Sequence, residues 1–485
     1  MSSNAETGLN AMPAVARKPQ YVFFLLLVIA WLIQRFVPGL FLGYGLLGVA
    51  GAFLSIYLLS SVLHGKTENI LVGWVLLFPL GYYFLSFPKE NPLFSFDRMV
   101  VGALLLGMLF AGDTRAVSTP LPLRQSALAW AFFILAVALS FLQLKNVPSL
   151  LRVLVDAFIL PPMLGWYVIR RFRVRTHLVT IHLVTCLVAA YLAAIGIAEI
   201  LTGEDIFPVG QEIYKAGLTD LIFRPNGPFA ADQSYGLIGL ISFCFLLFLW
   251  RALPQKPPKW HRAVHAVGVS AAAITALLPM FRSIAITLLL LVSWDTYSRR
   301  KRAAWPWLLG LAACVAAFLV AANSFFPEII QERVLSLENV YGRVAQQKQT
   351  FEVFSTHPVL GVGFSNFTPA AEQLRDSSTY LDVGAIDSPH NNLGAVLAET
   401  GLLGFIPYFL SQILLLRAFW KMRTADTQDT RLVWRMFLYV FISYWITGLS
   451  LTSGYYLDVN IWFIFVLCCM YKYGQMGDSK AVSFA

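Results

Sequence analysis

The chain has 485 residues, of which 58% are hydrophobic and 13% are charged, and its mean hydropathy is +0.67. Soluble domains carry about 25% charged residues, so this composition excludes a soluble globular protein and places the chain in a lipid bilayer. The formal net charge of +10 is expected in the cytoplasmic loops of a membrane protein, and it therefore does not indicate a nucleic-acid partner.

Apolar stretches long enough to cross a bilayer recur along the whole chain. They predict an all-α, polytopic membrane protein with about fourteen transmembrane helices, within a range of twelve to fourteen. No A-x-A-like cleavage site precedes the second stretch, so the first helix is expected to be retained. The predicted spans are 20–36, 39–63, 69–87, 98–112, 126–144, 149–170, 177–201, 234–251, 263–280, 283–298, 306–325, 391–419, 434–452 and 457–472.

Basic residues gather in four loops, at 170–175, 251–262, 298–302 and 421–435. Because Lys and Arg are retained on the cytoplasmic side, these loops are expected to be cytoplasmic, together with both chain ends.

This topology predicts one integral membrane domain, residues 20–472, between cytoplasmic tails at 1–19 and 473–485. Two long loops, 202–233 and 326–390, are then external.

The second external loop contains a periodic apolar pattern. This pattern predicts an amphipathic helix that lies on the membrane surface or covers a cavity, and simple packing against the bundle is the alternative. The segment "HPVLGVGFSNF" that follows is a glycine-rich turn region. The apolar positions are Ile330, Val334, Leu337, Tyr341, Val344 and Phe351.

His390 stands where the external loop meets the next apolar run. Asp387 or Ser388 can cap the helix and Pro389 suits its first turn, which places the imidazole at a helix N-terminus. That positive end favours a neutral imidazole, which can take a proton from a hydroxyl nucleophile, and it attracts anions. The alternative is an interfacial histidine that bonds to a nearby carbonyl. Asp387 could also orient the imidazole or bind an acceptor.

Two arginines are expected on the same side of the bilayer as His390. Arg224 ends the first external loop in "RPNGPF", and Arg282 lies between two apolar runs with no acidic residue within ten positions. A guanidinium at that depth lines a polar cavity or finds a partner, and its planar fork suits a phosphate or pyrophosphate. The alternatives are snorkelling for Arg282 and an ordinary loop residue for Arg224.

The other buried charges have structural interpretations. Arg152 and Asp156 are four residues apart and are expected to pair. Glu199 and Glu399 can hydrogen-bond between helices, and Glu399 could also line the cavity. The five cysteines fall in apolar runs without zinc-type spacing, and no external carboxylate cluster is seen. Neither a metal site nor a cofactor is therefore predicted.

Taken in order, these motifs resemble the O-antigen ligase/polymerase superfamily of bacterial envelope glycosyltransferases. The resemblance covers about residues 220–420. It rests on an Arg-x-x-Gly-x-Phe element, on a late external segment with the pattern HP..GVG..NF, and on His-Asn before a helix that carries AETGLLG. The matching positions are Arg224, Gly227, Phe229, His357, Pro358, Gly361, Gly363, Asn366, Phe367, His390, Asn391, Glu399, Thr400, Gly401 and Gly404.

The resemblance implies a metal-independent transferase with a fold similar to the C-type glycosyltransferases. Its donor would be a glycan on a polyprenyl pyrophosphate, bound by Arg224 and Arg282, and His390 would be the base. Asp387, Asn391 and Glu399 would bind the acceptor or support the site. The family often has Ser before the second arginine, where this chain has Phe281.

The expected function is a polysaccharide polymerase of the bacterial inner membrane, multi-pass, whose active site faces the periplasm. Its substrates would be lipid-linked glycans in the bilayer, and a chain-length regulator or export complex stays open as a protein partner. Alternatives are a ligase that transfers glycan to lipid A core or to a protein, a transporter without chemistry, and an inactive scaffold.

Overall fold

The computed structural model divides the chain into two compact units, residues 1–114 and 115–485, and each is described separately. The structure describes residues 41–84, 95–110, 121–141, 147–207, 224–229, 231–253, 257–300, 305–306, 309–310, 338–374, 389–424, 427–450 and 457–475.

The first unit contains three described helices, α2 (Phe41–Leu63), α3 (Thr67–Phe84) and α4 (Phe96–Phe110). The buried carboxylate of Asp97, in the first turn of α4, accepts a hydrogen bond of 2.6 Å from Nε1 of Trp74 in α3. A buried charge is tolerated only when it is hydrogen-bonded, so this contact fixes α3 against α4.

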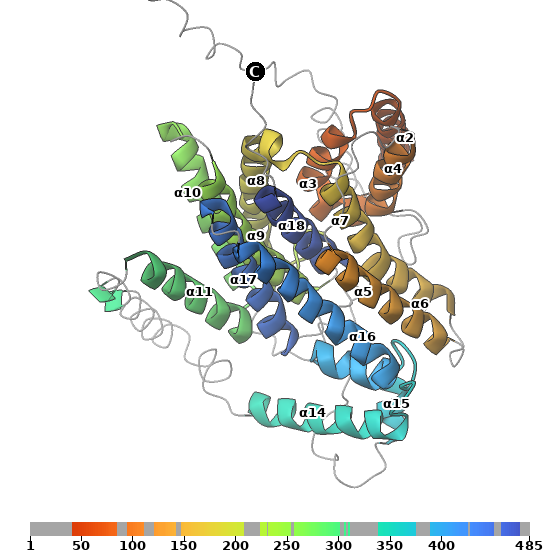
Figure 1. The fold of residues 1–485 in the computed structure, drawn as a ribbon. Helices are drawn as coiled ribbons and strands as arrows, with labels where there is room; N and C mark the ends of the chain where they lie inside the picture. Colours follow the sequence, from red (N-terminus) through yellow and green to blue (C-terminus); the bar gives the residue numbers. More distant parts are fainter. Residues whose placement is uncertain are drawn as a thin grey trace, which may run out of the picture. The chain divides into compact units, whose positions relative to one another are not determined.

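The second unit is also built of helices joined by loops and turns, with no strand among its described residues (Figure 1). Its elements are α5 (Leu121–Ser140), α6 (Val147–Val153), the π-helix η3 (Leu154–Ile159), α7 (Leu160–Arg170), α8 (Val174–Thr202), α9 (Asp232–Ala252), α10 (Lys259–Leu277), α11 (Arg282–Arg300), α14 (Glu338–Thr356), α15 (Phe367–Gln373), α16 (Asn392–Arg423), α17 (Gln428–Gly448) and α18 (Leu457–Gln475).

The helices follow the predicted spans closely. Each predicted span between 39 and 298, and each between 391 and 472, coincides with a helix. The all-α prediction is thus confirmed for the described residues. Five of their helical segments are long and apolar enough to cross a membrane: 123–140, 150–170, 174–202, 232–252 and 392–423. The total of about fourteen spans stays a prediction, because 20–36 and most of 306–325 lie outside the described residues.

The segment from α6 to α7 turns around two adjacent prolines, 161–162, that cannot donate backbone hydrogen bonds. The carbonyls four residues earlier therefore lose their helical partners, and the chain widens into the π-helix η3 just before the prolines. Both carbonyls find side-chain donors. Asn460 donates to the carbonyl of Ala157 over 2.9 Å, and Trp130 donates to that of Phe158 over 2.8 Å. The interruption is thereby joined to α18 and α5.

The expected ion pair on this segment is present. Arg152 and Asp156 lie 3.7 Å apart, one helical turn from each other.

A second interruption occurs inside α16, at Gly401, whose φ of 58° departs from helical geometry. In a continuous helix the N–H groups of residues 402 and 403 would bond to the carbonyls of 398 and 399. Here the backbone of the segment 358–363 supplies the partners for both N–H groups and for both carbonyls. Leu402 and Leu403 donate to the carbonyls of Pro358 and Val359 over 2.9 and 3.1 Å.

The two freed carbonyls are satisfied by the same segment. Val362 donates to the carbonyl of Ala398, and Gly363 donates to that of Glu399, each over 3.0 Å. The glycine-rich "GVG" stretch is therefore more than a turn: its backbone pairs with a broken transmembrane helix. Gly361 has a φ of 72°, and a Cβ there would collide with the backbone of Glu399. Only glycine permits this approach.

Helix α14 crosses the bundle next to the first turns of α16 and contacts that helix (Figure 1). Its inner face is buried through Gln349, Thr350 and Val353, whereas Val344 and Phe351 are 63% and 64% exposed. Two of the expected apolar positions therefore lie on the outer face of α14, and the location of this helix on a membrane surface stays a prediction. The expected positions 330–337 lie outside the described residues.

Substituting Gly361 tests the backbone pairing. We expect Gly361→Ala to lower the free energy of unfolding by about 1–3 kcal/mol. The added Cβ would push the segment 358–363 away from the break in α16, and alanine is strained at this positive φ. Thermal unfolding of the detergent-purified protein measures the effect. Gly342→Ala in α14 is the control, since a Cβ there meets nothing within 4 Å. Equal unfolding midpoints for the two variants would contradict the prediction.

Candidate functional site

The loop that carries Arg224 is held by a buried carboxylate. Glu199, at the end of α8 and fully buried, accepts hydrogen bonds from the backbone N–H of Gly227 over 2.9 Å and of Ile206 over 3.2 Å. Gly227 has a φ of 55° and lies over the ring of Tyr235. Glu199 was expected to form a hydrogen bond between helices. Its carboxylate oxygens instead accept hydrogen bonds from the backbone of the segment that joins α8 to α9. The carboxylate fixes the backbone from which Arg224 projects.

The guanidinium of Arg224 is positioned by two neighbours. It lies 3.5 Å from the carboxylate of Asp232, at the start of α9, and 5.0 Å from the ring centroid of Phe281. A guanidinium over an aromatic face is held by the ring quadrupole. Phe281, where the family often has Ser, therefore forms a platform for the other arginine.

Arg282 immediately follows Phe281 and opens α11, with its side chain exposed. The structure thus brings the two predicted arginines to one place, the Arg224 loop and the turn between α10 and α11. A cation at a helix N-terminus is electrostatically unfavourable, whereas an anion is favoured there. Asp232 already balances part of the charge of Arg224, and the binding of a further anion beside Arg282 stays a prediction.

The histidine group lies at the start of α16. Asn391, not Asp387 or Ser388, caps this helix: its Oδ1 accepts from the N–H of Leu393 over 2.9 Å and of Gly394 over 3.3 Å. The predicted cap was therefore wrong. His390 precedes the cap and adopts a φ of 43°, which is outside the helix but adjacent to its N-terminus.

Asp387 and Ser388 themselves lie outside the described residues. Asn391 still has a supporting role, because its amide donates to Oε1 of Gln347 in α14 over 3.0 Å. This bond joins the amphipathic helix to the residue that follows His390.

Glu399 is buried, with 3% of its surface exposed, and its carboxylate accepts a hydrogen bond of 2.9 Å from the backbone N–H of Ser365. Ser365 has a φ of 58°. Glu399 therefore holds this loop twice: its side chain accepts from Ser365, and its backbone carbonyl accepts from Gly363. This contact assigns Glu399 a structural role beside the start of α16.

The arginine group (Arg224 and Arg282) and the histidine group (His390 and Asn391) lie at the same end of the second unit. Arg435 and Tyr439 of α17 bond to Ser298 and Asp295 of α11, over 3.4 and 3.2 Å. The later residue of α17 bonds to the earlier residue of α11. The two helices are therefore antiparallel. The start of α11, at Arg282, therefore lies toward the end of α17, about 20 Å from Asp295 along the helix axis.

The end of α17 is also where α16 begins. Gly448, the last residue of α17, packs against the side chain of Asn392, two residues after His390. The helix ends that carry Arg282 and His390 are therefore on one side of the bundle. That this side is external, and that the two groups converge around one substrate, both stay predictions.

A cavity of about 160 Å³ lies elsewhere, between α5, α7, α16 and α18. Its walls are mostly apolar, and among the described residues that line it none is a predicted site residue. Two of its polar groups, Tyr444 and Asn460, already bond to each other over 2.9 Å. We therefore do not place the chemistry there.

The comparisons with known proteins point to the class of the site. Residues 281–409 match the family model described as O-antigen ligase, a range that includes Arg282, His390, Asn391 and Glu399. The match covers about a quarter of the chain. Together with the helical membrane fold, it supports the resemblance to the O-antigen ligase/polymerase superfamily and suggests a membrane enzyme of that kind. A search of curated proteins found no match.

The cap offers a direct test of the histidine group. We expect Asn391→Ala to cost about 1 kcal/mol, because two N–H groups at the start of α16 lose their acceptor. Asn391→Asp retains that acceptor and is expected to unfold near the wild-type temperature, since the Gln347 amide can rotate to donate to the carboxylate. Thermal unfolding of both variants measures this. Equal destabilisation by Ala and Asp would mean that capping is not the contribution of Asn391.

Proposed function

We propose that the protein is a polysaccharide polymerase on the outer face of the bacterial inner membrane. It transfers a glycan from a polyprenyl pyrophosphate donor to a sugar hydroxyl of a second lipid-linked acceptor. The observation that carries the proposal is the placement of Arg224 beside Phe281 and Arg282, at the same end of the bundle as His390. The family match supports the reaction class.

The proposed step is a single displacement. The acceptor oxygen attacks C1 of the donor sugar, its proton passes to the imidazole of His390, and the bond from C1 to the pyrophosphate oxygen breaks. Attack from the face opposite the leaving group inverts the anomeric centre. Arg224 and Arg282 stabilise the charge that develops on the departing polyprenyl pyrophosphate. This chemistry requires no metal ion or cofactor.

The remaining expected contacts fit this scheme as supports. Asn391 orients the backbone next to His390, and Glu399 maintains the loop beside it. Helix α14 borders the same region, with its outer face suited to lipid, so it can cover donor and acceptor where both enter from the membrane.

A transporter could use the pair Arg152–Asp156 and the prolines at 161–162 for alternating access. The carbonyls freed by these prolines are bonded by Asn460 and Trp130. That interruption is joined to two neighbouring helices, which weighs against its use as a hinge. The transporter and the inactive scaffold both predict no need for His390.

Substitutions of the three proposed residues test the enzyme hypothesis. His390→Ala, Arg224→Ala and Arg282→Ala are each expected to lower polymer formation in cells by at least ~100-fold, because proton transfer or leaving-group stabilisation is lost. The matched controls are His64→Ala and Arg262→Ala, at exposed positions outside the family motifs. Polymer is quantified per amount of protein in the membrane fraction.

Wild-type polymer from a well-expressed His390→Ala variant would refute the proposed base. Loss of polymer with both controls would point to a general folding defect instead.

A deletion strain separates polymerase from ligase. We expect single repeats to accumulate on the polyprenyl carrier, with polymer-capped lipid A absent, because chain growth itself is blocked. Mass analysis of extracted glycolipids measures this. Long chains retained on the carrier would instead assign the protein as a ligase that uses the same donor chemistry.

A further inference from the structure

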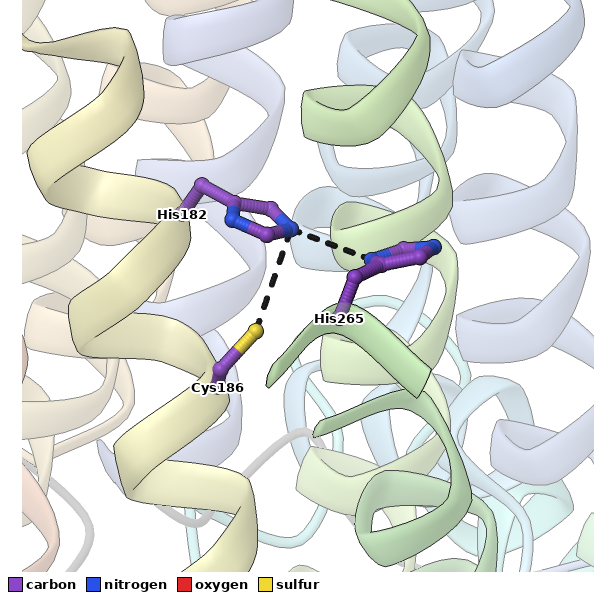
Figure 2. A group of neighbouring side chains, drawn as sticks. All are labelled: His182, Cys186 and His265. Atoms are coloured by element: carbon purple, nitrogen blue, oxygen red, sulfur yellow. Dashed lines mark hydrogen bonds between the residues drawn. The ribbon is translucent and has the colours of Figure 1, made fainter. Parts of the chain in front are cut away.

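Three side chains with metal-binding atoms meet between α8 and α10, at the ends of these helices away from Arg224. His182 and Cys186 are one turn apart on α8, and His265 faces them from α10 (Figure 2). Nε2 of His182 lies 3.0 Å from Nδ1 of His265 and 3.8 Å from Sγ of Cys186. The three atoms all lie within 4.8 Å of one another.

These separations can be compared with a tetrahedral zinc site. Zinc–nitrogen distances near 2.0–2.1 Å and zinc–sulfur distances near 2.3 Å place two nitrogen ligands about 3.3 Å apart, and a nitrogen and a sulfur about 3.6 Å apart. The observed 3.0 and 3.8 Å differ from these values by a few tenths of an ångström. Binding would replace the hydrogen bond between His182 and His265. Side-chain rotations would also have to bring Sγ of Cys186, which lies within 4.8 Å of Nδ1 of His265, to the separation that a shared ion requires.

The neighbours orient the three side chains. His261 places its Nε2 2.9 Å from Nδ1 of His182, which leaves Nε2 of His182 to face Cys186 and His265. Ligand histidines in metal sites typically bond through their second nitrogen in this way. The ring of Trp250 stacks on His265, with centroids 4.2 Å apart and planes 5° apart.

The backbone also permits the approach. Gly268 lies one turn after His265, and a Cβ there would collide with the side chain and Cα of Cys186. Glycine at this position lets α10 come close to α8 where the sulfur lies. His182 is fully buried and Cys186 is 2% exposed, so the sulfur and imidazoles face one another in an enclosed place.

We propose that Nε2 of His182, Nδ1 of His265 and Sγ of Cys186 bind a Zn²⁺ ion, with His261 as the residue that orients His182. Two imidazoles and one thiolate form a ligand set that zinc prefers. Binding displaces the thiol proton of Cys186, and a water molecule completes the fourth position. The inference does not rest on the proposed transferase activity.

The ion would act as a structural clamp. Glu199, which holds the Arg224 loop, lies about 20 Å from Cys186 along α8. The end of α10, just before the turn that contains Phe281, lies about 18 Å from His265 along that helix. Joining α8 to α10 would fix how these two helices align, and with it the relative position of the loop and the turn.

Metal binding to the full-length, detergent-purified protein tests the site. After chelator treatment and dialysis against Zn²⁺, we expect about one tightly bound equivalent per chain in the wild type, measured by elemental mass spectrometry. Cys186→Ser and His265→Gln are expected to lose it. The controls Cys244→Ser, a buried cysteine on α9, and His357→Gln, an exposed histidine, are expected to retain it. Equal zinc content in all five proteins would overturn the proposal.

Co²⁺ substitution provides a readout that does not depend on the stability of variants. The wild-type protein loaded with Co²⁺ is expected to show intense tetrahedral bands in the visible and a thiolate charge-transfer band in the near ultraviolet. Zn²⁺ is also expected to raise its unfolding temperature, because the ion binds the folded state alone. A weak octahedral spectrum without a sulfur band, or an unfolding temperature that Zn²⁺ leaves unchanged, would overturn the site.

Discussion

The second unit depends on one constraint: a backbone polar group freed inside an apolar bundle must find a partner within the protein. Two interrupted helices meet this requirement in different ways. Before the prolines at 161–162, side chains of Asn460 and Trp130 bond to the orphaned carbonyls. At Gly401, the backbone of 358–363 supplies two acceptors and two donors. The second solution also joins the loop segment 358–363 to the first part of α16.

Much of this fold could be predicted from local patterns, because span length and hydropathy are properties of continuous sequence. The ranges of the helices and the pair Arg152–Asp156 are examples. The pairing of 358–363 with α16 could not be predicted in the same way, since it joins residues about forty positions apart through backbone atoms. The sequence indicated a turn through its glycines, and the structure shows why two of them, Gly361 and Gly401, must lack a Cβ.

The site residues show the same division. Spacing singled out His390 and both arginines, whose roles stay predictions. It chose the wrong cap, because Asp387, Ser388 and Asn391 are all good capping types close together in the sequence. The supports of the arginine group were missed in part: Phe281 was noticed only as a departure from the family. The histidine–cysteine cluster was also missed, although His182 with Cys186 and His261 with His265 each have the four-residue spacing that places two side chains on one helix face.

Helix α14 reverses the usual rule for a helix on a water-soluble protein. Its polar residues Gln349 and Thr350 are directed inward, while Val344 and Phe351 are directed outward with Lys348 between them. Acyl chains and headgroups are the surroundings that such a face tolerates. Gln347 of the same helix bonds to Asn391, so a displacement of α14 at the bilayer surface would be transmitted to the residue that follows His390. Under the proposed function, lipid composition is then expected to alter the rate of transfer, and activities measured in detergent and in native membrane would differ.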